Sequence, residues 1–386
     1  MSGAMRRSHL VLTIAGCFGG GSLYGWSGYL PAVRTQFDVN NASASMVFSI
    51  ALVGFTLGVL VGPVLLALVR PSSRLPVIAG PAAVSLLLAG LSPGFAGFAV
   101  AYGVCFGFTS GALYNFAVSQ AAASGNPTLL VPVSVAAFGL GGAIFGPLHV
   151  WLTDAGWGLW SIAPALTCLG VVTAASLVCR TSGIAMDVSH RMAPAILRPD
   201  KSLAIFWVIF ASGSCSGLIV LGFAAQFLAR SPDGVQVAGL AIFLTALGNT
   251  LGRLSSALTT RHFGPDYATA GALTLSILTL AGLVFATSSA MVIGLLFLVA
   301  LGYGQLAATT PLLVKSRVSE DAFSGAFGWV FTGWGIAGLV GPWAAGWLLD
   351  VTGTLQYALV ICVVLSTLSL WLVLRLARMK NAEGIC

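Results

Sequence analysis

The sequence has 386 residues, of which 58% are hydrophobic and only 7% are charged, and its mean hydropathy is +0.98. A soluble domain carries about 25% charged residues, so this composition excludes an ordinary soluble protein and indicates an integral membrane protein. The net charge of +7 does not indicate nucleic-acid binding, because the basic residues are spread singly over short loops.

Apolar segments follow one another along the chain, each near the ~20 residues that a membrane-spanning helix needs. They predict an all-α integral membrane protein with about twelve transmembrane helices. The predicted segments are 9–30, 46–69, 75–91, 95–123, 129–153, 157–179, 203–228, 235–259, 268–286, 290–314, 323–349 and 355–376.

The basic residues predict how these helices are oriented. With a cytoplasmic N-terminus, 14 of the 17 Lys and Arg fall in cytoplasmic segments, Arg34 and Arg230 fall outside, and Arg253 remains within a helix. This bias follows the positive-inside rule and favours an even number of crossings. We therefore predict a multi-pass protein of the cell (inner or plasma) membrane with both termini in the cytoplasm.

A polar stretch halfway along the chain predicts a division into two halves. Residues 181–200 read as a cytoplasmic linker between an N-terminal six-helix bundle, 1–180, and a C-terminal one, 201–386. The halves resemble each other: GPVLLAL at 62–68 aligns with GRLSSAL at 252–258, which makes Pro63 the counterpart of Arg253. Gly-Pro pairs at 146–147 and 341–342 form a second match. Such repeats are typical of transporters with a central site between two pseudo-symmetric bundles.

The eighth predicted helix contains an arginine, Arg253, that is predicted to be buried in the membrane. Polar residues recur around it at spacings of three and four, which places them on one helix face: Thr245, Asn249, Arg253, Ser256 and Thr260. An arginine at the bilayer centre costs roughly 3 kcal/mol and usually marks a solute path. All ten Asp and Glu fall in predicted loops or at helix ends. We therefore predict that Arg253 binds an anionic substrate; the alternative is that it snorkels toward the membrane surface.

The twelve helices in a six-plus-six repeat, the glycine-rich fourth, fifth and eleventh helices and the short basic loops resemble the major facilitator superfamily across essentially the whole chain. Three motifs are similar to its oxalate/formate antiporter and monocarboxylate transporter branch: YGWS at 24–27, Arg253, and FTGWG at 331–335 followed by the second Gly-Pro pair. In that branch the arginine of helix eight binds the substrate carboxylate, and aromatic residues of helices one, four and ten wall the cavity. The resemblance implies these roles for Arg253, Tyr24, Tyr114 and Tyr303.

The chain also departs from that branch. Trp334 stands where oxalate-type members carry a lysine, and we expect it to help wall a site for a monoanion. Proton-coupled members carry a lysine in helix one and an aspartate close to the arginine, and neither is found here. Exchange or electrogenic uniport is therefore expected over tight proton symport. His149 is the only histidine placed to relay protons, although a packed or interfacial histidine is the plainer interpretation.

Three further polar side chains join the predicted substrate site: Asn115, Asn249 and Gln305. For the two asparagines, hydrogen bonding between helices is an equally good interpretation. Tyr24 fits packing at least as well as substrate contact. The seven cysteines show no metal-ligand spacing, and no enzyme signature is found, so we expect no metal, no cofactor and no enzymatic activity.

These inferences combine into one prediction of function. We expect a secondary active transporter or exchanger of a small organic monoanion, with a monocarboxylate as the first choice, which works as a monomer by alternating access in the lipid bilayer. The alternative is a proton-coupled exporter of drugs or metabolites with the same fold, and a remote alternative is a non-transporting membrane sensor.

Overall fold

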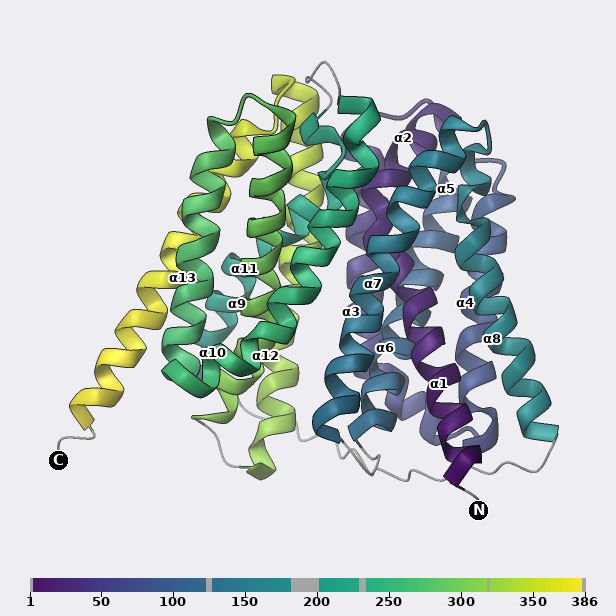
Figure 1. The fold of residues 1–386 in the computed structure, drawn as a ribbon, viewed down its shortest axis with the longest axis horizontal. Helices are drawn as coiled ribbons and strands as arrows, with labels where there is room; N and C mark the ends of the chain where they lie inside the picture. Colours follow the sequence, from purple (N-terminus) through teal and green to yellow (C-terminus); the bar gives the residue numbers. More distant parts are fainter. Residues whose placement is uncertain (1–2, 123–126, 182–200, 229–233, 318–319, 384–386) are drawn as a thin grey trace. The chain divides into compact units, whose positions relative to one another are not determined.

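The computed structural model describes residues 3–122, 127–181, 201–228, 234–317 and 320–383. The chain divides into two compact units, Met1–Asn40 with Met46–Ala193, and Asn41–Ser45 with Pro194–Cys386. Figure 1 shows each unit as a bundle of helices, coloured mainly purple to teal in the first and teal to yellow in the second. The predicted linker, apart from Thr181, lies outside the described residues.

The N-terminal half begins with a first crossing in three parts and continues with longer helices. Its elements are α1 (Gly3–Gly20), η1 (Gly21–Gly25), α2 (Trp26–Phe37), α3 (Asn41–Ala67), η2 (Pro71–Ser73), α4 (Arg74–Gly90), α5 (Phe95–Phe98), η3 (Ala99–Phe106), α6 (Gly107–Ala122), α7 (Pro127–Asp154), η4 (Gly158–Ile162) and α8 (Ala163–Thr181).

The C-terminal half consists almost entirely of long helices. Its elements are α9 (Lys201–Phe223), η5 (Gln226–Leu228), α10 (Gly234–Val284), α11 (Ser289–Lys315), α12 (Glu320–Thr352) and α13 (Gln356–Glu383).

The described helices account for all twelve predicted crossings. Nine of them are long and apolar enough to span a membrane by length and composition. The other three crossings are the α1–η1–α2 segment, the second part of α10, and α12. The protein therefore has an all-α membrane fold with six crossings in each half, as the sequence predicts.

Local irregularities explain where helix ends differ from the predictions. The eighth and ninth crossings, predicted as separate helices, run on as α10 with a sharp bend at Gly264, whose φ of 76° is left-handed. Glycine adopts this conformation without steric cost, and the following Pro265 can begin the next helical turn because it needs no N–H partner. The first crossing extends to Phe37, beyond its predicted end.

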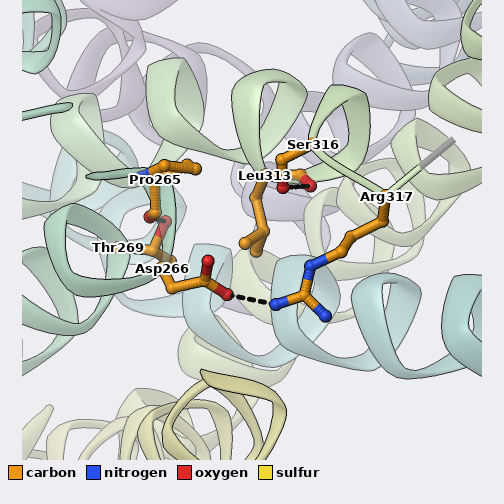
Figure 2. A network of polar contacts seen from close by, with 6 residues as sticks. All are labelled: Pro265, Asp266, Thr269, Leu313, Ser316 and Arg317. Carbon is orange, nitrogen blue, oxygen red and sulfur yellow. Dashed lines mark hydrogen bonds and ion pairs between the residues drawn. The ribbon is translucent and has the colours of Figure 1, made fainter. Parts of the chain in front are cut away.

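An ion pair joins the bend in α10 to the end of α11. Asp266 follows Pro265 and is almost fully buried, and its carboxylate accepts a hydrogen bond of 2.6 Å from Nη2 of Arg317. Figure 2 shows the two side chains reaching toward each other, with Thr269 hydrogen-bonded to the Pro265 carbonyl in the next turn. The pair lies at helix ends, which agrees with the prediction that the acidic residues fall in loops or at helix ends.

The two halves repeat the same helix pairing, but not in the predicted register. A Cβ added at Gly111 would overlap the carbonyl oxygen of Phe55, and one added at Gly304 would overlap that of Asn249. These contacts make Phe55 the counterpart of Asn249 and therefore Val59, four residues further on, the counterpart of Arg253. The predicted match of Pro63 with Arg253 is wrong by one helical turn.

Candidate functional site

Arg253 lies on α10 within the predicted polar stripe. Its side chain is half-buried, and Nε donates a hydrogen bond of 3.0 Å to Oδ1 of Asn249, one turn earlier. Helical geometry places side chains four residues apart on one face, so the sequence spacing is sufficient to bring the two together. The bond draws Nε toward the N-terminal end of α10, away from Arg261, and this argues against snorkelling in that direction.

The same stripe continues toward the bend in α10. Ser256 donates to the carbonyl of Arg253 at 2.7 Å, and Gln305 of α11 donates from Nε2 to Oγ1 of Thr259 at 2.8 Å. Gln305, predicted as a substrate contact, is therefore tied to α10. Thr259 was not among the predicted site residues, although its spacing of three from Ser256 is the signal that could have identified it.

Glycines allow α10 and α11 to approach closely enough for this contact. A Cβ added at Gly248 would overlap the carbonyl oxygen of Phe297, and one at Gly252 would overlap that of Leu301. Backbone approach of this kind is typical of small residues four apart in membrane helices. This close approach places the polar face of α10 that carries Arg253 next to α11.

Tyr303 and Trp334 are brought together in the C-terminal unit. Nε1 of Trp334 donates to the hydroxyl of Tyr303 at 2.7 Å, and its ring stacks on Phe331 at 5.3 Å. A Cβ added at Gly217 of α9 would overlap the Tyr303 ring, so the tyrosine fills a notch in that helix. Both side chains are almost fully buried, and they connect α9, α11 and α12.

Tyr24 and Tyr114, the predicted aromatic contacts of the N-terminal half, share one neighbour. The Phe138 ring lies 5.0 Å from Tyr24 and 5.4 Å from Tyr114, both edge to face. Tyr24 is buried, whereas Tyr114 is half-buried. Phe138 was missed because an isolated phenylalanine in an apolar helix carries no sequence signal. How these two tyrosines relate to Arg253 stays a prediction.

Two further predicted residues have packing contacts. Asn115 of α6 donates from Nδ2 to the carbonyl of Val59 at 3.2 Å, which supports the interhelical interpretation. His149 of α7 is almost fully buried, with Nδ1 2.9 Å from the carbonyl oxygen of Ser161. Its ring also lies 5.2 Å from that of Tyr29, whose hydroxyl donates to the carbonyl of Leu159.

Comparison with known proteins identifies the fold. Two solved structures, of the nucleoside transporter NupG and of a point mutant of NupG, are similar to this chain with TM-scores of 0.73 and 0.76. The matches cover 97% and 95% of this chain and 99% of each neighbour, at sequence identities of 14% and 13%. No protein-family model and no curated protein matches the sequence. The chain thus has the same fold as these two structures, and the sequence comparisons assign it to no family.

Proposed function

We propose that this protein is a secondary transporter or exchanger of a small organic monoanion, with a monocarboxylate as the first candidate. The observation that carries the proposal is Arg253, half-buried on a membrane helix and held by Asn249 through Nε. The similarity to solved transporters supports the transport function, and the arginine supports the class of substrate.

The chemistry of the guanidinium favours a carboxylate. Its planar array of N–H donors matches the two oxygens of a carboxylate and can bind them in a bidentate manner. The bond to Asn249 involves Nε, so end-on binding through the two terminal nitrogens leaves that bond intact. With a single cation, the site should prefer a substrate with one negative charge. A second negative charge would need a second cation in a low-dielectric site.

A nucleoside is the second candidate, because the two solved structures compared above are described as nucleoside transporters. At 13–14% identity their likeness supports the fold, and it carries no residue of a nucleoside site over to this chain. A nucleoside is neutral and would gain little from Arg253, so charge dependence separates the two candidates.

A ligand-stabilisation screen of the purified protein tests the proposal. Acetate and lactate represent monoanions, oxalate a dianion, and uridine a neutral nucleoside. A ligand at 100 times its Kd stabilises the folded state by about 2.7 kcal/mol, which is readily seen in a melting curve. We expect stabilisation by a monoanion, greatly reduced in Arg253→Gln and weakened in Arg253→Lys, which lacks the planar fork.

The matched control is Arg261→Gln, which removes an exposed arginine from the same helix. It should leave ligand stabilisation unchanged. Stabilisation by uridine and not by the anions would replace the proposal with the nucleoside candidate. Unchanged anion binding by a folded Arg253→Gln protein would show that the arginine is structural.

A further inference from the structure

Only one of the two polar atoms of the Asn249 side-chain amide makes a hydrogen bond within the described part of the chain. Its Oδ1 accepts from Arg253, while its Nδ2 is buried and has no hydrogen-bond partner among the described residues. The whole residue is 0% exposed. A buried donor without a partner is rare in folded proteins and calls for an explanation, because its desolvation is not compensated.

The guanidinium of Arg253 and Nδ2 of Asn249, the two hydrogen-bond donors of this pair, lie close together. Oδ1 and Nδ2 are bonded to the same carbon, so Nδ2 lies next to the Nε–Oδ1 hydrogen bond and beside the guanidinium. The carbonyl oxygen of Asn249 faces Gly304 of α11, which fixes this turn of α10 against its neighbour. The amide therefore holds the arginine with a neutral acceptor and adds a second N–H donor at the same place.

From this geometry we infer that Asn249 is the residue that makes the Arg253 site specific for an anion. It orients the guanidinium without adding negative charge, and its Nδ2 donates to the bound ligand. A ligand group that only accepts hydrogen bonds, such as a carboxylate, satisfies both residues. The inference rests on the proposed function, since it assigns the charge selectivity of that same site.

Substitutions of Asn249 distinguish its role in orienting the Arg253 guanidinium from the effect of a charge at the same position. Asn249→Asp retains an oxygen for Nε but replaces the Nδ2 donor with a charged acceptor, which pairs with the guanidinium in place of a ligand. Asn249→Leu retains the volume and adds no charge, but it removes both hydrogen bonds. Ser255→Asp is the control, because it adds the same charge to α10 two residues from Arg253, on a different face of the helix.

The experiment measures melting temperatures of the full-length protein with and without acetate, oxalate or uridine. We expect the Asn249→Asp protein to fold with an unchanged or raised melting temperature and to lose its stabilisation by acetate. Asn249→Leu should retain acetate binding with an affinity reduced about tenfold, and Ser255→Asp should bind acetate like the wild type. A purely structural asparagine would lower the melting temperature in both Asn249 variants without changing ligand preference.

The outcomes also separate this inference from the proposed function. If the wild-type protein is not stabilised by any anion, the proposed function fails and the role of Asn249 fails with it. If the wild type binds acetate and Asn249→Asp binds it equally well, only the inference is overturned. Loss of acetate binding in Ser255→Asp to the same extent would also overturn it, because the effect would then be one of helix charge alone.

Discussion

Gly58 and Gly252 make the same contact in the two halves of the chain. A Cβ added at Gly58 would overlap the carbonyl oxygen of Phe108, and one added at Gly252 would overlap that of Leu301. Each added Cβ would also lie 2.9 Å from a backbone nitrogen of the facing helix, that of Ala112 or of Gln305. Equivalent backbone-to-backbone contacts indicate that both halves depend on the same close helix pairing.

This contact predicts that Gly252→Ala destabilises the protein. The added methyl group meets backbone atoms, which cannot move aside as a flexible side chain does, and overpacking of this kind costs about 1–3 kcal/mol. Gly271→Ala on the same helix is the control, because no atom lies within 4 Å of its added Cβ. It should be neutral or slightly stabilising. Thermal unfolding in detergent measures both, and equal melting temperatures for the two variants would contradict the prediction.

Length and periodicity were enough to predict the crossings and the polar stripe. Each crossing needs only an apolar run of sufficient length, and the bond between Asn249 and Arg253 needs only a spacing of four residues. Both are local properties of one helix, so the sequence carries them directly.

The register of the internal repeat could not be predicted in this way. A shift of four residues turns a helix by only about 40° beyond a full turn, so the hydrophobic pattern hardly distinguishes Val59 from Pro63 as the counterpart of Arg253. Contacts between helices decide the register, as Gly111 and Gly304 do here. The pairing of Tyr303 with Trp334 likewise depends on how α11 and α12 pack.

The charge bias predicts the orientation in the membrane. Arg34 and Arg261 are both exposed, Arg34 in the last turn of α2 and Arg261 in α10 just before the bend at Gly264, and they are predicted to lie on opposite sides of the membrane. In a background without other reactive cysteines, Arg34→Cys should react with an impermeant thiol reagent from outside the cell, and Arg261→Cys only after the membrane is permeabilised. Reaction of both from the same side would refute the predicted alternation of the loops.

His149 is predicted to have a structural role. A carbonyl oxygen can only accept, so Nδ1 of His149 carries the hydrogen that it donates to Ser161. Asparagine can place its Nδ2 near the position of that nitrogen, so His149→Asn should retain most of the stability. His149→Ala removes a hydrogen bond from a buried carbonyl and should cost about 1–3 kcal/mol. If His149→Asn folds normally but changes the response of transport to a pH gradient, the histidine is a proton relay after all.

Trp334 and Tyr303 provide a test of whether the predicted aromatic wall is part of the scaffold. The indole N–H donates to the tyrosine hydroxyl at 2.7 Å, and both rings are almost fully buried. Trp334→Phe retains stacking on Phe331 but loses this bond, which contributes about 0.5–1.5 kcal/mol beyond the loss of ring volume. Tyr303→Phe removes the same bond from the other side, so the double variant should be less destabilised than the sum of the two single variants.

Trp334→Lys is the sharper variant, because it adds a cation at the position that the sequence resemblance aligns with a lysine of oxalate-type transporters. Burying an ammonium without a partner is costly, so we expect a lower melting temperature in the absence of ligand than for Trp334→Phe. A dianion would supply the missing charge, so oxalate should stabilise this variant more than acetate does, the reverse of the wild-type order. If oxalate and acetate stabilise Trp334→Lys in the wild-type order, Trp334 belongs to the scaffold joining α9, α11 and α12 and does not face the substrate.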